Sequence, residues 1–118
     1  MTIDLLGISF DAHNPSQLAI FWAKALHRNI ADGATEQFAA IAADDEPAHG
    51  PLLMFHRVPE GKTVKNRLHL DLKAVDIHAE ADRLTNLGAR QVRSLSDNDD
   101  RWISFTDPEG NEFDLVAG

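Results

Sequence analysis

The sequence of 118 residues contains no cysteine. This absence excludes a disulfide scaffold, a thiolate zinc site and a cysteine nucleophile. Basic residues are also few, because 11 Lys and Arg stand against 19 Asp and Glu and give a net charge of −8. Nucleic-acid binders, and proteins held on anionic lipid by charge, need a basic surface, so the composition argues against both classes.

The sequence also lacks long apolar runs, and none approaches the roughly 20 residues that a membrane span requires. The opening residues, MTIDLLGISFDAH, show neither the basic nor the apolar region of a signal peptide. The composition, 43% hydrophobic and 25% charged, is ordinary for a globular domain. We therefore expect a single cytoplasmic domain over residues 1–118, with no nucleic-acid or membrane partner.

The first half of the chain opens with a predicted strand and a predicted helix. From Leu5 to Ala12 the apolar residues alternate with small or polar ones, which is typical of a half-buried strand. Asn14 is a good N-cap and Pro15 suits the first helical position, and apolar residues then recur at helical spacing. These signals predict a helix from Pro15 to His27.

The remainder of this half has weaker patterns. Residues 28–36 suit a short strand or a loop, and residues 37–43 suit a helix by their alanines or a strand by Phe38 and Ile41. Two prolines and a glycine predict a turn over residues 44–51. Residues 52–58 form a predicted strand.

The second half repeats the opening pattern. Residues 67–73 (RLHLDLK) alternate strictly and predict a strand, and a predicted helix follows from the N-cap Asp76 to a stop at Gly88. Further strands are predicted at residues 91–95, 102–106 and 112–117, with an acidic loop at 96–100 and a turn at 107–111. At an offset of 62 residues, Asn14 falls on Asp76. We interpret the chain as two βαβββ repeat units, about residues 1–60 and 61–118.

The duplicated unit and three local sequences together resemble a known superfamily. The sequences are NPSQLAIFWAKAL after the first predicted strand, NRLHLDL at the start of the second half, and DPEGNEFDLV at the end. They are similar to those of the vicinal oxygen chelate superfamily and, more narrowly, of its glyoxalase-like or bleomycin resistance-like proteins. The resemblance implies an α+β fold, in which two tandem βαβββ units form a curled mixed sheet around a cavity with the helices outside.

The resemblance also implies that the strand faces opposite the leucines line the cavity. The alternation of residues assigns those faces, and Trp102 then stands where it can stack on a planar ligand, unless Ile103 and Phe105 set the pattern of that strand. Besides Gly7, Leu52 and Glu112, the candidate lining residues are Ser9, Met54, His56, Arg67, His69, Asp71, Trp102, Ser104 and Asp114. Of these, we expect Ser9, Met54, His56, Arg67, Trp102 and Ser104 to contact a ligand.

Metal-using members of the superfamily place one His, Glu or Gln ligand on each of four strands. Carried over, the fifth-strand position falls on His69 and the eighth-strand position on Asp114, where Glu is usual. The first-strand position falls on Gly7, which has no ligating atom, and the fourth on Met54, a thioether unsuited to a hard cation. Because a catalytic metal site usually has at least about three protein ligands, we expect no resident metal.

Other uses of His69 stay open. With a register slip of two residues, His56, His69 and Asp114 would form a site of two histidines and one carboxylate, a set that suits a divalent metal. Without metal, His69 and Asp114 would form a catalytic acid–base pair, in which the carboxylate holds the imidazole tautomer. The simplest alternative is a cavity-wall histidine bonded to Asp71, Asp114 or water.

These observations predict a small-molecule-binding glyoxalase-like protein with a degenerate metal site, no required cofactor, and its ligand held in the sheet cavity. The alternative is a metal-dependent lyase, isomerase or dioxygenase of the vicinal oxygen chelate type, which would need a divalent metal. Sheet edges are usually covered or paired, and relatives of this size commonly form twofold dimers, so we also expect a homodimer.

Overall fold

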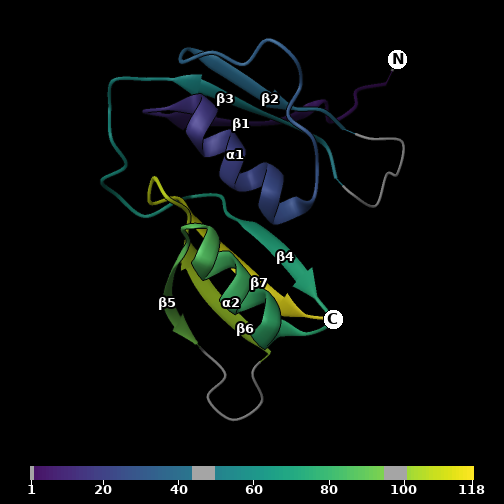
Figure 1. Cartoon of the computed structure of the whole chain (residues 1–118). Coiled ribbons are helices and arrows are strands. Elements are labelled where there is room, and N and C mark those ends of the chain that lie inside the picture. Colours follow the sequence, from purple (N-terminus) through teal and green to yellow (C-terminus); the bar gives the residue numbers. More distant parts are fainter. Residues whose placement is uncertain (1, 44–49, 95–100) are drawn as a thin grey trace. The chain divides into compact units, whose positions relative to one another are not determined.

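The computed structural model describes residues 2–43, 50–94 and 101–118. The chain divides into two compact units, Met1–Gly61 and Lys62–Gly118, and each unit has one sheet and one helix (Figure 1). Most of the turn predicted at residues 44–51, and all of the acidic loop predicted at 96–100, lie outside the described residues. In the described parts of the chain, neither helix has the length and apolar character needed to cross a membrane.

The first unit has a three-stranded sheet in the order β1-β3-β2. β1 pairs with β3 in parallel, and β2 pairs with β3 antiparallel. The prediction of a fourth strand in this unit is not met among the described residues, where Ile30 makes only a single β-bridge to Ile41. The elements are β1 (Gly7–Ala12), α1 (Pro15–Leu26), β2 (Phe38–Ile41) and β3 (Leu52–Arg57).

The second unit has a four-stranded sheet in the order β4-β7-β6-β5. β4 and β7 are parallel, while the β6–β7 and β5–β6 pairs are antiparallel. This is the complete βαβββ unit that the repeat predicts. Its elements are β4 (Leu70–Ala74), α2 (Ile77–Leu87), β5 (Arg90–Ser94), β6 (Trp102–Thr106) and β7 (Glu112–Ala117).

Both helices begin at the predicted residues because a side chain caps each of them. Asn14 Oδ1 accepts a hydrogen bond from the Gln17 backbone N–H at 3.3 Å, and Asp76 Oδ1 accepts one from Ala79 at 3.1 Å. Each bond satisfies one of the backbone donors that the first helical turn leaves without a partner. α2 ends at Gly88, whose φ of 121° suits glycine alone among the common residues.

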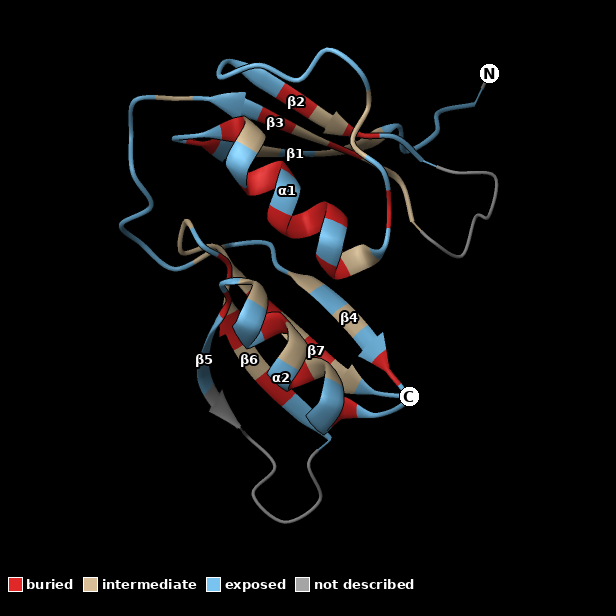
Figure 2. Ribbon diagram, in the orientation of Figure 1, coloured by how far each residue is buried: buried red, intermediate tan, exposed pale blue. Residues whose placement is uncertain are grey.

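Each sheet packs one face on its own helix, and the buried residues gather there (Figure 2). In the first unit Trp22 of α1 is fully buried, and its ring lies 5.5 Å from that of Phe10. In the second unit the rings of Phe105 and Phe113 stack at 5.5 Å, and Leu84 of α2 is buried with them. The opposite face of the second sheet is thereby left for polar residues.

Two leucines predicted to pack under the helices are exposed instead. Leu6 is 74% and Leu68 is 72% exposed. Both precede their strands, because β1 starts at Gly7 and β4 at Leu70, later than the alternation predicted. Among the described residues, strand pairing begins only after Leu6 and Leu68, so both lie outside the paired part of their sheets.

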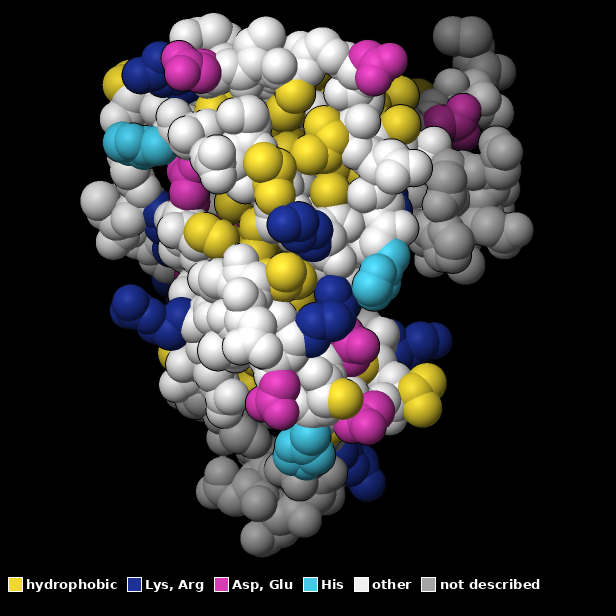
Figure 3. Space-filling view, in the orientation of Figure 1, with side chains coloured by type: hydrophobic (Ala, Val, Ile, Leu, Met, Phe, Trp, Pro, Cys, Tyr) yellow, Lys and Arg dark blue, Asp and Glu magenta, His cyan; other side chains and the backbone are white. Residues whose placement is uncertain are grey.

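Charged side chains of both signs are spread over the face of the second unit that carries α2 (Figure 3). Acidic side chains lie among the basic ones there, so the described residues on that face form no continuous basic surface. This distribution agrees with the net charge of −8.

Candidate functional site

A row of polar side chains occupies the face of the second sheet that is turned away from α2. Strand register brings them together, since Asp114 of β7 pairs with Asp71 of β4 on one side and with Ser104 of β6 on the other. Phe113 and Leu115, which alternate with Asp114 along β7, are buried on the helix side. The period-two geometry of three adjacent strands therefore builds this site.

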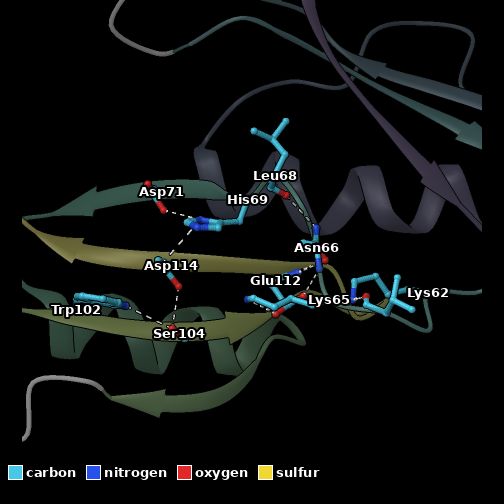
Figure 4. Close-up of polar contacts among 11 residues, drawn as sticks. Lys62, Lys65, Asn66, Leu68, His69, Asp71, Trp102, Ser104, Glu112 and Asp114 are labelled. Carbon is cyan, nitrogen blue, oxygen red and sulfur yellow. Dashed lines mark hydrogen bonds and ion pairs between the residues drawn. The ribbon is translucent and has the colours of Figure 1, made fainter.

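Hydrogen bonds connect these side chains across the sheet (Figure 4). His69 Nδ1 lies 2.9 Å from Asp71 Oδ1 and 3.9 Å from Asp114 Oδ2. The Ser104 hydroxyl donates to Asp114 Oδ1 at 2.8 Å. The Trp102 indole N–H donates to Ser104 Oγ in a long contact of 3.4 Å. Hydrogen bonds thus link Trp102, Ser104 and Asp114, and the Asp114 carboxylate lies 3.9 Å from His69.

An open cavity of about 390 Å³ lies over this face. Its volume falls within the range of small-molecule pockets in proteins. Trp102 is 40% exposed, which leaves part of its ring accessible to a ligand. The cavity is lined by Lys65, His69, Val92, Trp102, Ser104, Phe105, Glu112 and Asp114.

Glu112 closes the other end of the cavity and is held by four interactions. Its carboxylate accepts a hydrogen bond from the Asn66 backbone N–H, and its own backbone N–H donates to Asn66 Oδ1 at 3.2 Å. Lys65 and Lys62 lie 3.2 and 3.3 Å from its two oxygens. The Asn66 bond, helped by both lysines and opposed by partial burial, lowers the pKa of Glu112 from 4.5 to about 2. Glu112 is therefore an ionised anchor for the segment that leads to His69.

A group of three residues could supply metal ligands. His69, Asp71 and Asp114 each offer one ligand atom, and these atoms lie within 4.8 Å of one another. One imidazole and two carboxylates are a chemically suitable set for a divalent ion, so a metal is plausible here. From the sequence we expected His69 and Asp114 here, with His56 as their third partner. Asp71 was missed in that role, although its position two residues after His69 already placed it on the same strand face.

His56 belongs to the sheet of the first unit. It lies on β3 opposite Asp11 of β1, and its ring lies 5.0 Å from that of Phe38. Ser9 and Met54 are register partners on the same pair of strands. The structure therefore places these three candidates together on the β1–β3 pair of the first sheet.

The surroundings of Arg67 and Gly7, two further candidates, are also defined. Arg67 is exposed in the segment before β4 and is not among the residues that line the cavity. Gly7 lies so close to β3 that a Cβ atom there would sit 2.5 Å from the Leu52 carbonyl oxygen. The first-strand ligand position is therefore closed to any side chain unless the backbone moves.

The chain matches a family model and is similar to several solved structures. A family model described as "Glyoxalase-like domain" matches residues 7–116. Among curated proteins no significant match is found. The chain is similar in structure to a glyoxalase/bleomycin resistance protein/dioxygenase family enzyme from Burkholderia phytofirmans PsJN. That match has a TM-score of 0.76 and 12% identity, and it covers 98% of each chain.

Two fosfomycin resistance proteins, both FosX, are also similar. A variant of the Listeria monocytogenes protein, complexed with Mn(II) and 1S,2S-dihydroxypropylphosphonic acid, matches with a TM-score of 0.75 and 15% identity, over 100% of this chain and 92% of that one. The Mesorhizobium Loti protein matches with a TM-score of 0.74 and 16% identity, over 100% and 94%. At such identities the likeness establishes a shared fold.

Proposed function

Because the chain belongs to the family of glyoxalase-like domains, and with it to the vicinal oxygen chelate superfamily, we propose that it binds a small molecule on the polar face of its second sheet. We propose that residues 1–118 act as one glyoxalase-like domain and that the protein is a cytoplasmic homodimer. The observation that carries the binding proposal is the cavity of about 390 Å³, which has an accessible indole at one side and a connected row of polar groups along its floor.

A degenerate metal site is part of this proposal. Of the four positions at which the superfamily carries ligands, Gly7 offers no ligating atom and Met54 offers only a thioether. The close approach of Leu52 to Gly7 supports this proposal, because it leaves no space for a ligating side chain at position 7. His69 and Asp114 remain, and two protein ligands leave most of the coordination shell of a divalent ion to water.

A metal-dependent lyase, isomerase or dioxygenase is the second candidate. It is favoured by the group of His69, Asp71 and Asp114, in which Asp71 restores a third ligand atom. The Listeria monocytogenes protein of the same fold is complexed with Mn(II). These three residues would hold the ion, and a bound divalent ion would polarise a substrate oxygen. Ser104 would then keep the Asp114 carboxylate oriented.

Elemental analysis and a thermal-shift screen distinguish the two candidates. The binder predicts little stoichiometric Mn, Fe, Ni or Zn in purified protein, and a melting temperature that chelator does not lower. It also predicts that some members of a metabolite and antibiotic panel raise the melting temperature, because they bind only the native state.

The result that would overturn the binder is one equivalent of metal that is lost in His69→Ala. The matched control is His78→Ala, which removes an exposed histidine from α2. If His78→Ala keeps the metal and His69→Ala loses it, the metal-dependent enzyme becomes the better assignment, and Asp71→Asn tests the third ligand.

A further inference from the structure

The direction of each hydrogen bond on the polar face determines which groups remain for a ligand. The Trp102 indole nitrogen can only donate, so its contact with Ser104 Oγ uses the indole N–H. Ser104 has a single hydroxyl proton, which it donates to Asp114 Oδ1 at 2.8 Å. The indole N–H and the Ser104 hydroxyl are therefore both directed along the sheet to other protein groups (Figure 4).

His69 also directs a donor to another protein side chain. Its Nδ1 lies 2.9 Å from Asp71 Oδ1, and in this contact the carboxylate oxygen accepts. Nδ1 therefore carries a proton, which it donates to Asp71. Asp114 Oδ2, at 3.9 Å from Nδ1, is beyond hydrogen-bond distance and keeps its acceptor capacity.

Among the described residues that line the cavity, the cation is Lys65. It does not supply a donor to a ligand beside Trp102. Lys65 donates to Glu112 Oε1 at 3.2 Å, at the end of the cavity where Lys62 and Asn66 also bind Glu112. The side chain of Lys65 is 79% exposed, so solvent screens its charge strongly. An anionic group placed beside Trp102 would face Asp114 instead.

From these directions we infer that the ligand is a planar ring that carries N–H donors, such as an amidine or an amino-substituted ring, and that anionic ligands are rejected. The ring stacks on Trp102, and its donors meet Asp114 Oδ2. A cationic donor gains most, because charge-assisted hydrogen bonds are about twice as strong as neutral ones and cations stack favourably on indole. This inference rests on the proposed binding function and specifies its ligand class.

Benzamidine and benzoate form a matched pair of probes, because they share ring and size but differ in donors and charge. Each is titrated into ¹⁵N-labelled protein while the two indole N–H resonances are followed. We expect benzamidine to shift the Trp102 resonance in a saturable way and benzoate to leave it unchanged. Trp22, which is fully buried in the first unit, serves as the internal reference.

Variants test the assigned partners. Asp114→Asn should weaken benzamidine binding about tenfold or more, since it replaces a charged acceptor. Asp82→Asn removes the same charge from an exposed position on α2 and should leave the affinity unchanged. Equal weakening in both variants would show that overall negative charge attracts the probe, and it would overturn the inference.

The comparison of the two probes on the unaltered protein does not depend on any variant folding. If benzoate shifts Trp102 as strongly as benzamidine, the cavity binds small molecules but the donor class is wrong. If neither probe shifts Trp102 at millimolar concentration, the inference fails as well. In both cases the thermal-shift screen still decides the proposed function independently.

Discussion

Replacing Glu112 with glutamine should destabilise the protein at neutral pH and have little effect in strong acid. Glutamine keeps an oxygen that can accept the Asn66 backbone N–H but loses the charge that attracts Lys62 and Lys65. The side chain is nearly isosteric, so the change tests electrostatics rather than packing.

The size of the effect follows from the lowered pKa. A fall from 4.5 to about 2 sets an upper bound of about 3.5 kcal/mol, at about 1.4 kcal/mol for each tenfold change in acid dissociation. The Glu112 side chain is 29% exposed and that of Lys65 is 79% exposed, so solvent reduces this bound. We expect Glu112→Gln to lower the free energy of unfolding by about 1–2 kcal/mol at pH 7.

The pH dependence has a definite sign. Because the pKa of Glu112 is lower in the folded state, its contribution is complete above pH 4.5 and is lost as the pH falls through about 2. Urea unfolding of both proteins, followed by circular dichroism, should show a difference in unfolding free energy that is constant from pH 5 to pH 7 and shrinks below about pH 4. Glu60→Gln, which neutralises an exposed glutamate of the first unit, is the control.

Two results would refute this reasoning. One is a difference between wild type and Glu112→Gln that stays the same from pH 7 to pH 3, since the stabilisation would then not depend on ionisation. The other is an equal loss of stability in Glu60→Gln, because the effect would then reflect net charge rather than the contacts with Asn66 and the lysines.

Three further predictions concern the helices, the first sheet and assembly. Asp76→Ala should lower the free energy of unfolding by about 1 kcal/mol through loss of the α2 cap, and Asp76→Asn should keep most of it; thermal unfolding compares the two. Gly7→Ala should cost about 1–3 kcal/mol, because its Cβ would meet the Leu52 carbonyl oxygen at 2.5 Å, whereas Gly61→Ala, with 3.6 Å to its nearest neighbour, should be mild in the same urea assay. Light scattering should give twice the chain mass of 13.0 kDa, and a monomer at micromolar concentration would count against the dimer.

The sequence predicted the starts of both helices and the bounds of the last two strands correctly, because each depends on residues that are close together in the chain. Asn14 and Asp76 cap helices because their short side chains reach the free N–H groups of the first turn, whatever lies elsewhere in the fold. The strands at residues 102–106 and 112–117 match their predicted bounds because a rigid turn separates them. In that turn, Asp107 Oδ1 accepts from the backbone N–H groups of Glu109 and Asn111.

Strand beginnings were less predictable, because alternation continues beyond the paired residues. Leu6 and Leu68 fit the period of two, but a strand exists only where a neighbour provides backbone partners, and β1 and β4 gain theirs from Gly7 and Leu70 onward. The ambiguous residues 37–43 gave β2 because Ala39 and Ile41 pair with buried positions of β3. Long-range pairing decided both cases.

The sequence by itself determined the repeat, the helix starts, and the choice of His69 and Asp114 as candidate residues. Each of these depends on residue type and on spacing along one element. Only the tertiary structure decided that Asp71 is the hydrogen-bond partner of His69, that Ser104 holds Asp114, and that Glu112 anchors the segment before β4. Those contacts depend on register between strands and on side-chain direction, which pairing across the sheet sets and local sequence does not encode.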